Sequence, residues 1–165
     1  RRPGIARAAV TGAAGLLLAW PIVVTVTAAA ALLVVASGGE APDAIAHRTL
    51  ALIADDPFSP AALGMILLVS LLVPWIEEAV YRGMLQRGLV EAGLGRWAAI
   101  GLVAGFFALR HRGVADPHAI AGLFVLGLAF GLVQERTGRL TTAVVMHAAF
   151  NAGNVLLAVV ASPAG

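Results

Sequence analysis

The amino-acid sequence predicts an all-α integral membrane protein, a polytopic bundle of helices around a buried polar cavity. Of its 165 residues, 60% are hydrophobic and 12% are charged, whereas a soluble domain is about half apolar and a quarter charged. The apolar residues fall in runs of about 20, the length that a helix needs to cross a bilayer. Because burying charge in lipid is costly, the few ionisable residues inside these runs are the first functional candidates.

Composition excludes several kinds of site. The sequence has no cysteine, which removes disulfides, thiolate nucleophiles and cysteine-ligated metals. All eleven basic residues are arginines, and the net charge is +2. These arginines cluster at the ends of the apolar runs, where membrane proteins carry them. We therefore expect a lipid bilayer as surroundings and no nucleic-acid partner.

The runs predict one membrane-embedded domain over residues 1–165 with about five spans. A surface helix is expected at 44–54, before the second span, and Asp116-Pro117 resembles a helix start. The chain begins at Arg1 without methionine, so we expect it to lack helices that precede it. The spans are expected at 10–36, 61–89, 95–109, 118–134 and 140–161.

Arginine counts in the short loops predict the orientation. One side of the membrane receives seven arginines and the other receives three, Arg48, Arg110 and Arg112. The arginine-rich side is expected to be cytoplasmic. Its members are Arg1, Arg2, Arg7, Arg87, Arg96, Arg136 and Arg139.

The second span carries two neighbouring acids. Glu78 and Arg82 are four residues apart and share a helix face, so they can pair. Glu77 is rotated by about 100° and lacks such a partner. A carboxylate without a cation in a poorly solvated site suits a general base, whereas Glu78 and Arg82 suit a structural pair. Pro74, three residues before Glu77, breaks the helix hydrogen bonding and favours a cavity there.

Two further polar groups lie in the third and fifth spans. His111 ends the third span, and His147 and Asn151 share one face of the fifth. Imidazole and amide groups can donate hydrogen bonds to an oxyanion, although a histidine that only packs the helices together is an alternative. Counting residues from the cytoplasmic side places Glu77 and His147 at similar depths, with His111 somewhat deeper.

Other hydrolytic chemistries fit less well. No aspartate lies within a span, which argues against a paired-aspartate protease. Ser70 lacks the glycine-flanked turn of a serine nucleophile, and no H-E-x-x-H zinc motif is present. Nothing in the sequence requires a cofactor, although Glu77, His111 and His147 could together bind zinc.

Three motifs in order resemble the CPBP family of intramembrane proteases, which includes type II CAAX prenyl endopeptidases and bacterial Abi or bacteriocin-immunity proteins. Glu77, Glu78 and Arg82 match E-E-x-x-x-R, and the segment 127–138 looks like the one before the third motif. The resemblance covers about residues 61–160. The other two motifs, F-x-x-x-H and H-x-x-x-N, are matched by Phe107 with His111 and by His147 with Asn151.

The resemblance implies an intramembrane endopeptidase of a bacterial cytoplasmic membrane, with its site open to the cytoplasm. Glu77 and His111 would activate water, and His147 and Asn151 would form the oxyanion hole. Glu78, Arg82 and Phe107 would support the site. The substrate would be a membrane-associated protein or peptide.

Two other functions are compatible with the sequence. A non-enzymatic immunity or partner-binding protein could share this fold, but it would be free to lose Glu77. A transporter fragment could use Glu77 and His147 as a proton relay, but that reading predicts internal repeats, and none is apparent.

Overall fold

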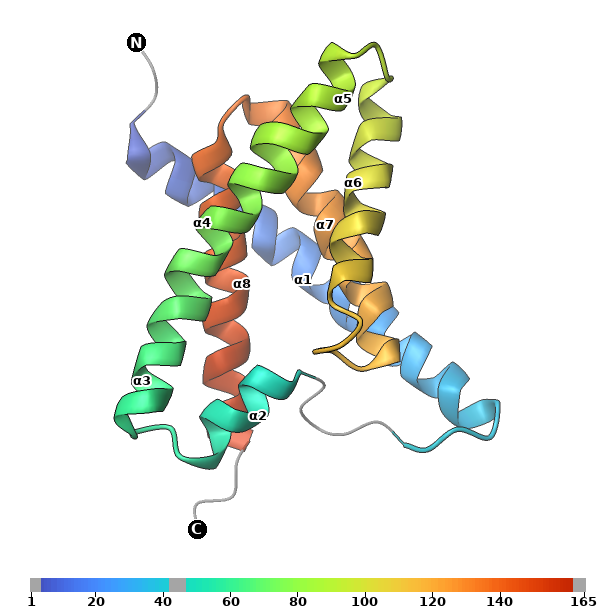
Figure 1. Ribbon diagram of the computed structural model, residues 1–165, viewed down its shortest axis with the longest axis vertical. Helices are drawn as coiled ribbons and strands as arrows, with labels where there is room; N and C mark the ends of the chain where they lie inside the picture. The colour runs from blue at the N-terminus through green and yellow to red at the C-terminus, as the bar shows by residue number, and fades with distance from the viewer. Residues whose placement is uncertain (1–3, 42–46, 162–165) are drawn as a thin grey trace.

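The computed structural model describes residues 4–41 and 47–161. Within these residues the protein is all-α, as the composition predicts, and strand pairing is limited to one isolated bridge between His47 and Ala115. The helices run lengthwise through the molecule, and α8 (Leu140–Ala161) lies in its middle (Figure 1).

The second span is one 32-residue helix, Pro60–Glu91, with two π-helical stretches. It passes without a break through five segments: α3 (Pro60–Leu67), η1 (Leu68–Leu72), α4 (Val73–Glu78), η2 (Ala79–Gln86) and α5 (Arg87–Glu91). Single π turns in helices are frequent at functional sites. Here the first lies just before Pro74 and the second contains Arg82.

Within the described residues, four helices are long and apolar enough to cross a membrane: α1 (Ile5–Ala36), Pro60–Glu91, α7 (Pro117–Thr137) and α8. The third expected span forms α6 (Arg96–Arg110), which has 15 residues. At 1.5 Å per residue it covers about 22 Å, less than the roughly 30 Å of a hydrocarbon core. α6 is therefore a shorter helix that packs against α7 and η2.

The long helices leave much apolar surface exposed. Only 11% of the most apolar stretch of α1 is buried within the protein, and Leu17, Leu18, Leu32 and Leu33 are each at least 70% exposed. Leucines exposed on the face that points away from the bundle suit a lipid solvent. The helical bundle is thus an integral membrane protein.

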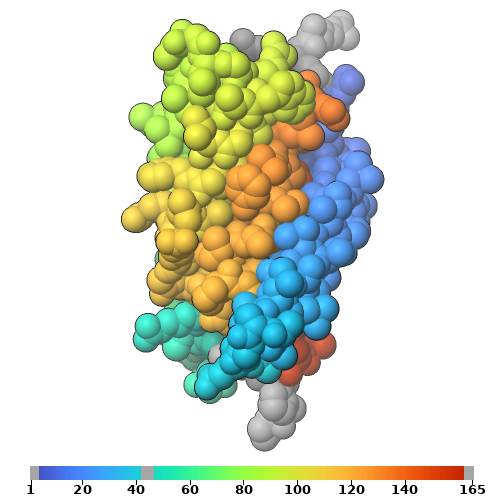
Figure 2. All heavy atoms as spheres, turned by 90° about the vertical axis from the view of Figure 1, so that its right-hand side faces the viewer, coloured from blue at the N-terminus to red at the C-terminus, as the bar shows by residue number. Residues whose placement is uncertain are grey.

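α1 lies obliquely across the bundle and packs against α7 and α8. Figure 2 shows α1 in blue beside α7 in orange, with α6 in yellow on the other side. Glycines allow the close approach: a Cβ on Gly12 would lie 2.8 Å from the Thr142 carbonyl oxygen, and one on Gly153 would lie 2.9 Å from the Trp20 ring. Small residues at helix crossings are typical of membrane bundles.

The two ends of the bundle differ. The start of α1, the α5–α6 turn and the α7–α8 turn lie at one end, while α2 (Arg48–Asp55) and the end of α8 lie at the other (Figure 1). α2 matches part of the predicted surface helix, and residues 44–46 of that prediction lie outside the described residues. Its first turn is capped by His47, whose Nδ1 accepts a hydrogen bond from the Thr49 amide. Pro117 begins α7 as predicted, although the Asp116 side chain forms no capping hydrogen bond.

Candidate active site

Pro74 creates a free carbonyl that another helix satisfies. In η1, Val73 N–H bonds to the carbonyl of Leu68, five residues earlier. The next bond in that ladder would run from residue 74 to Val69, but proline has no N–H. Instead, Asn151 Nδ2 on α8 donates to the Val69 carbonyl at 2.8 Å. Pro74 thus leaves the Val69 carbonyl without a donor in its own helix, as expected from the proline, and Asn151 supplies the missing hydrogen bond.

Glu78 lies at the centre of a buried ion cluster. Arg82 Nη1 donates to Glu78 Oε1 at 3.1 Å, so the pairing predicted from the four-residue spacing is confirmed. The same oxygen lies 2.8 Å from His147 Nδ1. Both Glu78 and Arg82 are essentially inaccessible, at 0% and 1% exposure. Glu78 therefore joins the second span to α8, a link that the sequence analysis did not predict.

Arg82 is also tied to α7. Its Nη2 donates to the Gly127 carbonyl at 3.0 Å, and one turn later Gln86 Nε2 donates to the Gly131 carbonyl at 3.2 Å. Both carbonyls belong to glycines, and a Cβ on Gly131 would lie 2.8 Å from Gln86 Oε1. Sequence reasoning missed Gln86, although its position four residues after Arg82 places it on the same helix face.

Phe107 packs directly over this cluster. The Arg82 guanidinium carbon lies 5.0 Å from the Phe107 ring centre and 5.2 Å from that of Phe130. Phe130 in turn stacks on the His147 ring, with centres 4.7 Å apart. Aromatic faces attract cations and exclude water, so they stabilise the charged pair inside the bundle.

Glu77 has a different environment. Its side chain is 25% exposed, and its Oε2 atom lies 3.8 Å from His147 Nε2. That oxygen is buried and has no hydrogen-bond partner among the described residues. A separation of this size between polar atoms is one that a bridging water can fill. Glu77 is thus the acid that is left without a tight partner.

His111 is held with one nitrogen free. Its Nδ1 lies 2.8 Å from the Phe107 carbonyl, which can only accept a hydrogen bond, so Nδ1 carries the proton. Nε2 of the neutral ring therefore keeps its lone pair. His111 follows the last residue of α6, where helix geometry ends, and this arrangement fixes the ring on the helix end.

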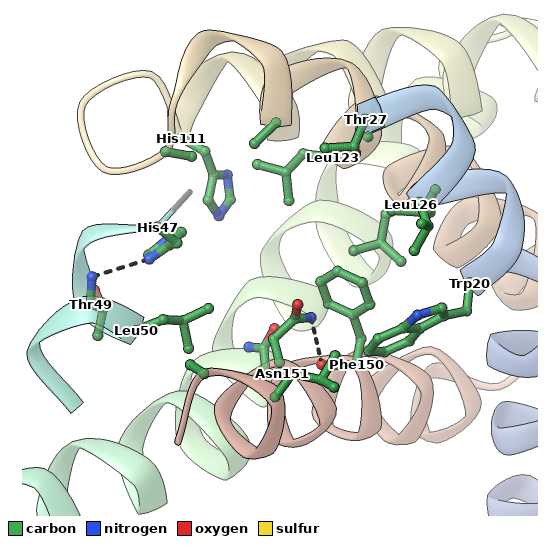
Figure 3. Close-up of a pocket in the computed structure, with 18 of the residues that line it drawn as sticks. Trp20, Thr27, His47, Thr49, Leu50, His111, Leu123, Leu126, Phe150 and Asn151 are labelled. Atoms are coloured by element: carbon green, nitrogen blue, oxygen red, sulfur yellow. Dashed lines mark hydrogen bonds between the residues drawn. The ribbon is translucent and has the colours of Figure 1, made fainter. Parts of the chain in front are cut away.

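One pocket brings the four candidate residues together. It has a volume of about 660 Å³, and Glu77, His111, His147 and Asn151 all contribute to its lining. Most of the remaining lining is apolar, with Trp20, Leu123, Leu126 and Phe150 on its walls (Figure 3). The four candidate residues therefore share a largely apolar pocket, where charges are weakly screened.

The proton positions restrict what His147 and Asn151 can donate. Glu78 Oε1 already accepts from Arg82, so it acts as a carboxylate toward His147, and His147 Nδ1 is the donor. His147 can then offer a second N–H only as an imidazolium. Asn151 has two amide hydrogens and uses one on Val69. One donor of Asn151 remains for another acceptor.

The acidic groups around Glu77 and Glu78 outnumber the cationic ones. Glu77, Glu78 and Arg82 comprise two carboxylates and one guanidinium, so one negative charge lacks a partner when both acids are ionised. On α8, His147 Nε2 lies 3.8 Å from Glu77 Oε2.

The metal set considered from the sequence does not form a compact site. Among the described residues, no group of three or more histidine, aspartate or glutamate side chains is arranged to hold a metal ion. His147 already uses Nδ1 on Glu78, and His111 uses Nδ1 on a carbonyl. These bonds leave Nε2 of each ring as the atom that could bind a metal, as in many zinc sites, so the spacing alone argues against zinc: Glu77, His111 and His147 would have to move closer together to form a three-ligand site.

Two histidines that sequence reasoning overlooked also line the pocket. His47 precedes α2, and its ring centre lies 6.4 Å from that of His111; Figure 3 shows the two rings on neighbouring segments. Burial, with a smaller contribution from the charge of His111, lowers the pKa of His47. His118, the second residue of α7, is the other. Neither belongs to a recognisable spacing pattern, so only the packing of the segments identifies them.

The pocket extends away from the arginine-rich end. Its lining continues through Ala31 at the end of α1, Leu50 of α2, Ala115 and Ala161 of α8, which all belong to the end that carries α2. A cytoplasmic arginine-rich end and a site open to the cytoplasm were both expected. These two expectations conflict, because the pocket leads to the α2 end, opposite the arginine-rich end (Figure 1).

Comparison with known families identifies a related group. The family model described as Type II CAAX prenyl endopeptidase Rce1-like matches residues 59–153, which is more than half of the 165 residues. No match was found among curated proteins or among solved structures. The matched range includes Glu77, His111, His147 and Asn151, whereas α1, α2 and His47 precede it.

Proposed function

The chain belongs to the type II CAAX prenyl endopeptidase Rce1-like family, a family of proteases, and from this we propose that it is an intramembrane endopeptidase that uses Glu77 as its general base. The observation that carries the proposal is the Glu77 carboxylate, which lines the pocket with one oxygen unpartnered. Its neighbour Glu78 binds Arg82 and His147 through Oε1 and, among the described residues, also has an unpartnered oxygen, Oε2, but it is inaccessible and does not line the pocket. The substrate would be a membrane-associated protein or peptide whose apolar part enters the pocket.

In the proposed reaction, a water bound beside Glu77 gives a proton to the carboxylate as its oxygen attacks the carbonyl carbon of the peptide bond. His111 Nε2, which has a free lone pair, accepts the water's second hydrogen in a hydrogen bond and orients it. Glu77 then passes the proton to the leaving amine nitrogen, and the carbon–nitrogen bond breaks. A base placed in this way contributes about 10²–10⁴-fold to a rate.

Two donors would stabilise the oxyanion. Asn151 has one amide hydrogen beyond the one bound to Val69, and His147 adds an N–H at Nε2 when its ring is protonated. The Glu78 carboxylate, 2.8 Å from Nδ1, holds the ring in place. Loss of one oxyanion donor typically costs about 10²–10³-fold in rate.

The test is cleavage of a membrane-peptide library by detergent-purified protein, with Glu77→Gln as the decisive variant. Glutamine keeps the shape but cannot accept the proton, so we expect a loss of about 10²–10⁴-fold in kcat with an unchanged melting temperature. Glu91→Gln is the matched control, because Glu91 lies on the same long helix and pairs only with exposed Arg87. Cleavage by a well-folded Glu77→Gln protein at the native rate would disprove the glutamate-base mechanism.

A chelator separates the water mechanism from a zinc mechanism. Because the donors do not gather into a three-ligand group, we expect cleavage to persist after extended treatment with a zinc chelator. Activity that is lost on chelation and restored by added zinc would contradict this expectation and would require the histidines to rearrange around the metal.

The absence of cysteine in the sequence allows a clean test of which end is cytoplasmic. Ser37→Cys labels the end that carries α2, and Ala92→Cys labels the arginine-rich end; both positions are exposed. We propose that the arginine-rich end faces the cytoplasm, so an impermeant thiol reagent added to intact cells should label Ser37→Cys alone. Labelling of Ala92→Cys alone would reverse the orientation and open the pocket to the cytoplasm.

A further inference from the structure

A second, polar pocket lies at the arginine-rich end of the bundle, far along the helices from the pocket that holds Glu77. It is formed where α1 begins beside the α7–α8 turn (Figure 1), and its volume is about 300 Å³. Its polar lining consists of three arginines and three threonines, namely Arg7, Arg136, Arg139, Thr11, Thr137 and Thr142. No acidic side chain contributes to it.

The arginines of this pocket lack counterions. At the same end, Arg87 pairs with Glu91 at 2.7 Å and Arg96 pairs with Glu135 at 3.6 Å. Across the part of the chain that the structure describes, no such ion pair involves Arg7, Arg136 or Arg139. Three positive charges therefore face one small space without a negative partner.

Two buried polar atoms at the pocket have no hydrogen-bond partner within the described residues. One is Nη1 of Arg139, and the other is the hydroxyl of Thr142, whose side chain is 0% exposed. Thr137 provides the contrast, because its hydroxyl donates to the Val133 carbonyl and accepts from the Arg139 amide. Leaving a buried donor unsatisfied is unfavourable, so a ligand that accepts hydrogen bonds from these groups would remove that cost.

The donors define the ligand. Guanidinium groups only donate hydrogen bonds, and their planar arrangement matches two oxygens of a phosphate at once. The pocket lies where the spanning helices α1, α7 and α8 begin or end, which is the level of lipid headgroups. We propose that this pocket binds a phosphate group, held by Arg7, Arg136 and Arg139 with the Thr142 hydroxyl. The phosphate belongs either to an anionic phospholipid or to a soluble phosphate.

Thermal unfolding of the detergent-purified protein tests the site without reference to proteolysis. The protein is titrated with phosphatidylglycerol, with phosphatidylcholine, and with inorganic phosphate against sodium chloride of equal ionic strength. We expect phosphatidylglycerol or phosphate to raise the melting temperature above its reference. Arg7→Gln and Arg139→Gln should weaken the apparent affinity about tenfold or more, since charge-assisted hydrogen bonds are lost.

Two further variants keep the test selective. Arg87→Gln removes the same charge at the same end but lies outside the pocket, so its response should equal that of the unmodified protein. Thr142→Val keeps the shape and removes only the unpartnered hydroxyl, so the ligand-free protein should stay folded and respond less to the ligand.

The outcomes separate the sources of phosphate. A shift with phosphatidylglycerol alone assigns the pocket to a lipid headgroup, and a shift with inorganic phosphate as well assigns it to phosphate in general. Equal responses to phosphatidylglycerol and phosphatidylcholine, together with none to phosphate, would overturn the proposal. An affinity loss in Arg87→Gln as large as in Arg139→Gln would also overturn it, because charge alone would then explain the binding.

Discussion

Glu77 and Glu78 are neighbours in the sequence, yet the bundle gives them opposite surroundings. Glu78 Oε1 accepts hydrogen bonds from Arg82 and His147 and is closed off from solvent. Glu77 lines the pocket and is 25% exposed; each acid keeps one oxygen without a hydrogen-bond partner among the described residues, but only Glu77 reaches the pocket. A helix rotation of about 100° between adjacent residues produces this difference. An ion pair can therefore fix one acid within the bundle while the adjacent acid, on another helix face, reaches the pocket.

The comparison extends to the residues around each acid. On the Glu78 side, Arg82 and Gln86 bind carbonyls of α7, and aromatic rings cover the guanidinium. On the Glu77 side, the polar contact is longer, 3.8 Å to His147 Nε2, and the neighbouring residues line the pocket. We therefore expect substitutions around Glu78 to affect stability first and those around Glu77 to affect turnover first.

Arg82→Ala should give the largest effect on stability. It leaves Glu78 buried without its cation, which typically costs about 3–5 kcal/mol. Thermal unfolding in detergent measures the change, with Arg87→Ala as the control because its pair with Glu91 is exposed and such pairs contribute little to stability. Similar melting temperatures for the two variants would contradict the claim that the buried Glu78–Arg82 pair stabilises the fold more than the exposed Arg87–Glu91 pair.

Asn151→Ala should have an intermediate effect that combines both sides. It leaves the Val69 carbonyl without its donor, which costs about 1–3 kcal/mol, and it removes the spare amide hydrogen from the pocket. We expect a modest loss of stability and a larger loss of kcat. Asn154→Ala is the control, because its amide binds only the Phe150 carbonyl of its own helix. Unchanged kcat in a stable Asn151→Ala protein would remove Asn151 from the oxyanion hole.

His47→Gln should give the smallest effect, visible as a change in pH dependence. Burial lowers the pKa of His47 in the folded protein below its ordinary value of 6.5, so the unfolded chain binds a proton more readily. The contribution to the free energy of unfolding is complete above pH 6.5 and declines as the pH falls through the interval below it. Unfolding measured from pH 7.5 downward should show a shallower decline in the variant. Identical profiles would show that His47 titrates alike in both states.

Much of this architecture could be predicted from particular residues. The apolar runs predict the long helices, and the spacing of Glu78 and Arg82 predicts their pairing, which is confirmed. Pro74 predicts a broken hydrogen-bond ladder, and η1 lies directly before it. The catalytic roles of Glu77, His111, His147 and Asn151 stay predictions, because geometry alone does not measure turnover. The third apolar run, 95–109, was predicted to cross the membrane, and it forms the 15-residue α6, which is not among the helices long enough to do so.

The sequence by itself determined what depends on neighbours along the chain: an all-α membrane protein, the Glu78–Arg82 pair, and a second acid on another helix face. Only the tertiary structure decided what depends on approach between helices. Residues from different helices meet at three places: the contact of His147 with Glu78, the hydrogen bond from Asn151 to Val69, and the polar pocket lined by Arg7, Arg136 and Arg139. Helical periodicity fixes the face on which a side chain lies, but the partner on that face depends on how distant helices pack.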